Sequence, residues 1–152
     1  MDQLKDIAAI IGVVVALFTL IKAFVEYSQQ GAQKRIELYL KLRSKFDDNP
    51  TFAEMRRLLD DGDPKIAEVS FKNRSDYASY FEEIALLKNS RVIKPDVAFY
   101  MFAWEATQCW QSDDFWQGFD RNDQYWGLLR IFVEEMEAIG KRFEVGNKAF
   151  KF

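Results

Sequence analysis

The longest apolar stretch of the chain lies near its N-terminus. From Ile7 to Val25 the sequence carries a single charged residue, Lys22. On a helical projection the apolar residues surround the axis, so this stretch has no amphipathic face. A helix of this length measures about 28 Å at about 1.5 Å per residue, close to the roughly 30 Å hydrocarbon core of a bilayer. The pattern therefore predicts a transmembrane helix; a buried core helix and a cleaved signal peptide are the alternatives.

The chain after Tyr27 is polar, and basic residues such as Lys34, Arg35 and Lys41 come soon after it. Lysine and arginine close to a membrane span mark its cytoplasmic side. We therefore expect a single-pass protein of the inner (cytoplasmic) membrane with its N-terminus outside. Residues 1–28 would form the membrane anchor and residues 29–152 a cytoplasmic domain. A chain with one cysteine, and hence no cysteine pair, agrees with a reducing compartment.

One side of the N-terminal stretch carries small residues. On a helix they fall within about 80° of one another, and small residues let membrane helices approach closely. A threonine in such a face can also form a hydrogen bond across the contact. We therefore predict a homo-oligomer that associates through this face. Its residues are Ala8, Gly12, Ala16, Thr19 and Ala23, with Lys22 beside them.

The rest of the chain alternates helical patterns with short breaks and has no convincing strand alternation. Capping residues followed by proline or acidic residues are typical of helix N-termini. The predicted fold is all-α: an N-terminal transmembrane helix followed by a compact cytoplasmic domain of about five helices. The predicted helix starts are Asn49-Pro50, Asp63-Pro64, Asn73 or Ser75, Lys94-Pro95, Ser112 and Asn122-Asp123.

The amino-acid composition excludes most of the common types of catalytic site. The 152 residues include no histidine and one cysteine, and the net charge is −3. Histidine is the commonest general base and metal ligand, and one cysteine cannot build a zinc site. The sequence has no phosphate-binding loop, dinucleotide-binding motif or nucleophile elbow. We therefore predict a protein that is not an enzyme and uses no metal or cofactor, with an all-carboxylate hydrolase that uses magnesium as the alternative. The acidic balance disfavours duplex nucleic acid as a partner.

Basic residues gather near the predicted helix ends. Arg91 and Lys94 precede a helix N-terminus, where backbone N–H groups favour an anion. Aromatic residues, 16% of the chain, are expected mainly in the core, with a ligand-binding groove as the alternative. Of two adjacent acids, Glu82 is expected to face away from the core and Glu83 to lie half-buried against an arginine. The candidate ligand-binding residues are Arg56, Arg57, Lys72, Arg74, Arg91, Lys94 and Trp104.

Three segments carry a resemblance to known proteins. They are Asn49-Pro50-Thr51-Phe52 with Arg56-Arg57, Tyr80-Phe81-Glu82-Glu83-Ile84-Ala85-Leu86-Leu87, and Val97-Ala98-Phe99-Tyr100-Met101-Phe102. Together they resemble a family of uncharacterised bacterial proteins with an N-terminal membrane helix and a helical cytoplasmic domain. The overall plan is also similar to small membrane effectors of type III CRISPR antiviral systems. That similarity implies a helical domain that binds a cyclic oligoadenylate and membrane helices that respond.

These features support two functional hypotheses. The first is a homo-oligomeric membrane effector whose cytoplasmic domain binds an anionic ligand, such as a cyclic oligonucleotide messenger in antiviral defence. Differential affinity of the ligand for two arrangements of the membrane helices would then gate or perturb them. The second is a membrane-anchored scaffold or accessory subunit that docks a protein partner through an aromatic helical face. A ligand affinity that depends on Arg91 and Lys94 distinguishes the first from the second.

Overall fold

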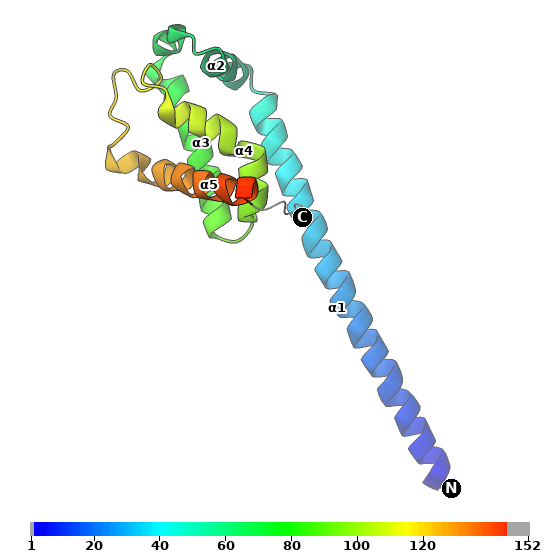
Figure 1. Cartoon of the computed structure of the whole chain (residues 1–152). Coiled ribbons are helices and arrows are strands. Elements are labelled where there is room, and N and C mark those ends of the chain that lie inside the picture. The colour runs from blue at the N-terminus through cyan, green and yellow to red at the C-terminus, as the bar shows by residue number, and fades with distance from the viewer. Residues whose placement is uncertain (1, 146–152) are drawn as a thin grey trace. The chain divides into compact units, whose positions relative to one another are not determined.

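The structure, a computed structural model, describes the backbone of residues 2–145 and the side chains of residues 15–143 except 28, 29 and 32. The described residues form helices and turns without a strand, which confirms the all-α prediction. The helices are α1 (Asp2–Asp47), α2 (Pro50–Asp60), η1 (Pro64–Glu68), α3 (Phe71–Asn89), α4 (Pro95–Gln111), η2 (Gln124–Trp126) and α5 (Gly127–Val145), where η marks a short 3₁₀-helix (Figure 1).

The chain divides into two compact units, one ending at Leu40 and the other beginning at Lys41, so α1 contributes to both. The first unit is helical throughout its described backbone. From Val15 to Tyr27 its large apolar side chains are exposed, among them Phe18 and Phe24.

The transmembrane prediction is wrong. Among the residues that the structure describes, no helix is long and apolar enough to cross a membrane. In the part of α1 whose side chains are described, the polar residues Lys22, Glu26 and Gln30 interrupt the apolar pattern.

The start of α2 is set by its capping residues, as predicted. The side-chain oxygen of Asn49 accepts hydrogen bonds from the backbone N–H groups of Thr51 (3.0 Å) and Phe52 (3.2 Å). Pro50 begins the helix, where its missing N–H group costs nothing. At the other end, Gly62 adopts a positive φ of 61° just after α2, the conformation that glycine adopts most easily after a helix.

Two other predicted starts differ from the structure. The cap of α3 is Ser70, whose hydroxyl accepts the N–H group of Asn73 (3.3 Å), so α3 begins ahead of Asn73 and Ser75. No helix begins after Ser112. Its hydroxyl instead accepts the N–H group of Phe115 (3.2 Å) and closes a turn. Serine satisfies turns as well as helix ends, so a capping residue alone does not determine whether a helix or a turn comes next.

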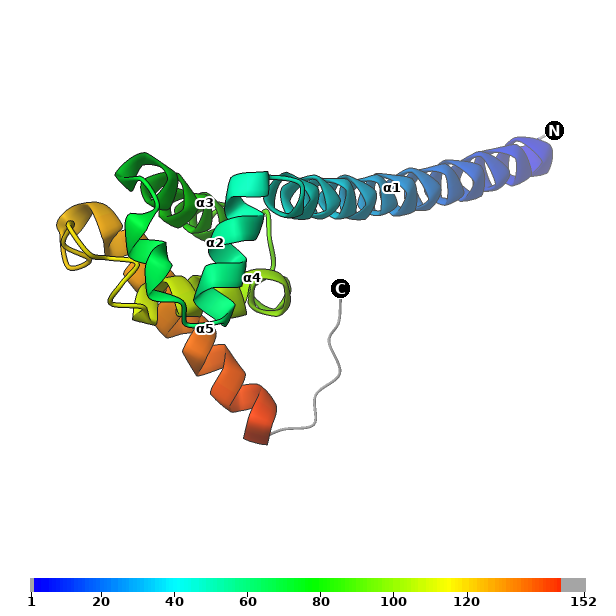
Figure 2. The same ribbon diagram turned by 90° about the horizontal axis from the view of Figure 1, so that it is seen from above.

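The core of the second unit is aromatic, as predicted. The ring of Phe46, at the end of α1, lies 5.7 Å from Phe52, 5.1 Å from Tyr80 and 5.7 Å from Phe81 (centroid to centroid). The helices α3, α4 and α5 contact one another, and α2 contacts both α3 and α4 (Figures 1 and 2). This packing holds α3 between its neighbours and leaves a groove on each of its flanks.

Candidate functional site

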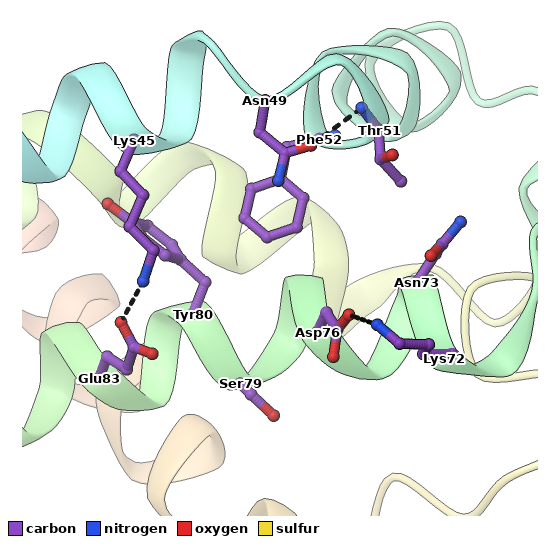
Figure 3. Close-up of a pocket in the computed structure, with 10 residues that line it drawn as sticks. All are labelled: Lys45, Asn49, Thr51, Phe52, Lys72, Asn73, Asp76, Ser79, Tyr80 and Glu83. Carbon is purple, nitrogen blue, oxygen red and sulfur yellow. Dashed lines mark hydrogen bonds and ion pairs between the residues drawn. The ribbon is translucent and has the colours of Figure 1, made fainter.

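The first groove lies between the end of α1, the start of α2 and one flank of α3 (Figure 3). Its volume is about 420 Å³. We call it the polar groove, because eight of its ten lining residues are charged, amide or hydroxyl side chains other than tyrosine. The lining residues are Lys45, Asn49, Thr51, Phe52, Lys72, Asn73, Asp76, Ser79, Tyr80 and Glu83.

The charges of the polar groove cancel within the fold. Lys45 pairs with Glu83 (Nζ to Oε2, 2.9 Å), and Lys72 pairs with Asp76 one turn along α3 (Nζ to Oδ2, 2.5 Å). Figure 3 shows both pairs on the side of α3 that faces α1 and α2. The Asn49 side chain is already used to cap α2. An anion entering this groove would therefore compete with two carboxylates for the two lysines.

The second groove lies on another flank of α3, where η2 and the turns before it face the helix. Its volume is about 440 Å³, and Ser79 lines both grooves. In Figure 3 the side chain of Ser79 points away from α2. We call this second site the aromatic groove. Its lining residues are Phe71, Ser75, Ser79, Glu82, Phe119, Asp120, Asp123, Tyr125 and Trp126.

Ring edges and faces form the wall of the aromatic groove. Phe119 lies 5.2 Å from Phe71 in an edge-to-face arrangement and 5.9 Å from Trp126 (centroid to centroid). Trp126 is buried, whereas Phe71 and Tyr125 keep 57% and 76% of their surface exposed. Exposed apolar surface costs roughly 25 cal/mol per Å² relative to burial. The fold therefore anchors one side of the wall and leaves two rings available for contact.

Three carboxylates share this groove with the rings. Among the described residues, none of the three forms an ion pair. Asp120 accepts the N–H group of Asn122 (2.8 Å) and Asp123 that of Tyr125 (3.0 Å), so these carboxylates are held in place by turns. Glu82 is half-buried. Burial raises the pKa of Glu82, and a hydrogen bond with the backbone of Leu129 partly offsets this rise.

Arg74 fixes the segment that carries Phe119. Its guanidinium donates to the backbone oxygens of Val69 (2.9 Å), Phe115 (2.5 Å) and Gln117 (2.9 Å). It also lies 5.1 Å from the ring centroid of Phe119. Burial lowers the pKa of Arg74, although an arginine side chain stays charged in proteins. This residue therefore positions the wall of the groove without lining it.

The predicted ligand-binding residues of α2 already have partners. Arg56 pairs with Asp47 (2.5 Å), and Arg57 pairs with Glu54 (2.8 Å) and Asp61 (3.2 Å). Neither lines the polar or the aromatic groove.

The remaining predicted residues are scattered. Arg91 and Lys94 are exposed between α3 and α4, and the φ of 59° at Arg91 ends α3 in the left-handed conformation. The length of α3 places Arg91 more than about 20 Å from Arg74 at 1.5 Å per residue. Trp104 is 64% exposed on α4, and its indole N–H donates to Asp60 (3.0 Å). The structure thus places these residues apart, and of the predicted set Lys72 lines the polar groove.

The two adjacent glutamates are placed the other way round from the prediction. Glu83 is exposed and pairs with Lys45, not with an arginine. Glu82 is half-buried and lines the aromatic groove. The sequence held a signal for this groove, since acids stand beside aromatic residues at 119–120 and again at 123–126. The residues that sequence reasoning missed are Phe71, Ser75, Ser79, Phe119, Asp120, Asp123, Tyr125 and Trp126.

The predicted self-association face belongs to the first unit. The Thr19 hydroxyl donates to the backbone oxygen of Val15 (2.8 Å), so it is satisfied within its own helix. Lys22 pairs with Glu26 at 3.8 Å. Self-association through this face stays a prediction. Ala16 and Ala23 are exposed, whereas Ala8 and Gly12 lie outside the described side chains.

Comparison of the chain with protein-family models, with curated proteins and with solved structures found no match. The resemblance noted from the sequence therefore stays a prediction. In the part of the chain that the structure describes, no group of three or more His, Cys, Asp or Glu side chains is arranged to hold a metal ion. We therefore choose the candidate site by comparing the two grooves of α3.

Proposed function

We propose that the unit beginning at Lys41 is a non-enzymatic docking domain that binds a protein partner through the aromatic groove. The observation that carries the proposal is the pairing of exposed rings with carboxylates that have no ion-pair partner among the described residues. Aromatic side chains at the centre of a contact supply much of its binding energy. A surrounding polar rim is typical of protein interfaces.

The side chains that could act as nucleophiles support a binding role over catalysis. The one cysteine, Cys109, is buried, and burial raises the pKa of its thiol well above the usual value. A buried thiol of raised pKa is a poor nucleophile. The carboxylates of the aromatic groove stand beside apolar rings, which suits recognition of a ligand better than activation of water.

The anionic-messenger hypothesis remains a prediction with less geometric support. It needs several cations on one surface, and the lysines of the polar groove each have a carboxylate partner. The carboxylates of the aromatic groove would repel a phosphate.

Site-specific photo-crosslinking tests the proposal. A photoreactive phenylalanine analogue replaces Tyr125 in the aromatic groove of the full chain, and in a matched variant it replaces Asn73 in the polar groove. In the cells that make the protein, we expect a discrete crosslinked product from position 125 that is absent from position 73. A product from position 73 alone, or no discrete product from position 125, would contradict the proposal.

A further inference from the structure

Resting on the proposed function, we infer that the aromatic groove receives a basic side chain, a lysine or arginine of the partner protein. In this arrangement the cation forms an ion pair with Glu82 and lies against the exposed ring of Tyr125. Asp120 and Asp123 also line the groove, are exposed, and add attraction.

The first support is the charge of the lining. Glu82, Asp120 and Asp123 are acidic, and the lining has no lysine or arginine. The polar groove, in contrast, contains one lysine for each of its acids. An acidic or phosphorylated segment would meet three like charges in the aromatic groove, whereas a basic segment would supply the missing counter-charge.

The second support is the presence of ring faces beside these acids. A guanidinium or ammonium within about 6 Å of a ring centroid is attracted to the ring face. The wall already contains one such contact, because the guanidinium of Arg74 lies 5.1 Å from the centroid of Phe119. A partner's arginine at the exposed ring of Tyr125 would make the same type of interaction.

The third support is the environment of Glu82. Glu82 lines the groove together with Trp126 and is half-buried, and burial raises its pKa. A half-buried carboxylate without a counter-ion has lost part of its hydration, and a cation in the groove compensates for that loss. The carboxylate of the neighbouring Glu83 already has a counter-ion, because Lys45 Nζ lies 2.9 Å from its Oε2.

A positional-scanning library of random hexapeptides tests the inference with the full 152-residue chain. The chain carrying Tyr125→Ala identifies the peptides whose binding depends on the groove. We expect groove-dependent peptides to be enriched in arginine or lysine at one position at least. Replacing that arginine by citrulline, its neutral isostere, should weaken binding roughly tenfold.

Two matched variants assign the effect to the groove. Glu82→Gln should also weaken the selected arginine peptide roughly tenfold, whereas Glu83→Gln should leave its affinity unchanged. Groove-dependent peptides that are neutral or acidic, or an arginine peptide that binds equally to the Glu82→Gln chain, would overturn the basic-partner inference and leave the docking function standing. A library with no peptide sensitive to Tyr125→Ala would count against both.

Discussion

The two grooves of α3 are nearly equal in volume, about 420 and 440 Å³, and they share Ser79. They differ in whether their charged side chains are paired. In the polar groove each lysine has a carboxylate partner. In the aromatic groove the acids have no ion-pair partner among the described residues, and two rings are exposed. A surface whose charges are already satisfied gains little from a ligand, whereas one with unmatched charge and exposed apolar area gains from both.

The difference arises from how each groove is assembled. Part of the polar groove is local, since Lys72 and Asp76 stand four residues apart and meet on one face of α3. The aromatic groove combines α3 with residues 119–126, which lie far along the chain. Its wall therefore depends on tertiary contacts, above all on those made by Arg74.

The largest expected effect comes from Arg74→Met. Its guanidinium binds the backbone oxygen of Val69, just before α3, and that of Phe115, after α4. Hydrogen bonds from a charged group contribute about 1.5–3 kcal/mol each, and their loss leaves buried carbonyls unsatisfied. We expect the free energy of unfolding to fall by about 3 kcal/mol, measured by urea denaturation, with faster amide exchange in residues 114–119.

Lys72→Met is the matched control in the polar groove. Lys72 is exposed and pairs with Asp76 on the same helix. Such pairs contribute less than about 0.5 kcal/mol, so this variant should unfold almost as the parent does. Equal losses in the two variants would mean that the contacts of Arg74 do not hold the wall.

A smaller effect is expected from the ion pair between Lys45 and Glu83 in the polar groove. Lys45 and Glu83 are both more than half exposed, and exposed pairs contribute about 0.2–1 kcal/mol. A double-mutant cycle of Lys45→Met and Glu83→Gln should therefore give a coupling free energy in that range, reduced by salt. A coupling well above about 1 kcal/mol would show that the polar groove is more rigid than its exposure indicates.

The sequence predicts the helices better than it predicts either groove. The start of α2 at Pro50 and the aromatic core around Phe46 can be traced to local capping and to ring content. The predicted start of α3 lies later in the sequence than the observed start. Ser70, Asn73 and Ser75 can all cap a helix, and tertiary packing selects among them. The transmembrane prediction was wrong, since no helix among the described residues is long and apolar enough to cross a membrane.

The site could not be predicted because it depends on which partner each charge finds. Sequence reasoning grouped Arg56, Arg74 and Arg91 by residue type, but the fold gives Arg56 a carboxylate and Arg74 a set of backbone oxygens. It could not place Phe71 beside Phe119, since a long stretch of chain whose path the pattern does not determine separates them. Conversely, the acids beside aromatic residues at 119–126 were visible in the sequence. That they form one groove with α3 follows only from the structure.

The smallest effect gives the sharpest comparison, because two adjacent residues should respond with opposite signs. Burial raises the pKa of Glu82, so the folded state disfavours its ionised form. Glu82→Gln should therefore increase the free energy of unfolding by a few tenths of a kcal/mol at pH 7. A glutamine oxygen can still accept a hydrogen bond from the backbone, so that contact need not be lost.

The same substitution at Glu83 removes the carboxylate that faces Lys45 and should decrease the free energy of unfolding slightly. The gain from Glu82→Gln must shrink as the pH falls and vanish below about pH 4, where the parent carboxyl is protonated in both the folded and the unfolded state. Denaturation curves at several pH values measure both variants. If Glu82→Gln still increased the free energy of unfolding at low pH, the effect would come from packing. If it decreased the free energy of unfolding at pH 7, a cation of the chain itself would already compensate Glu82, and this carboxylate would not be available to pair with a partner.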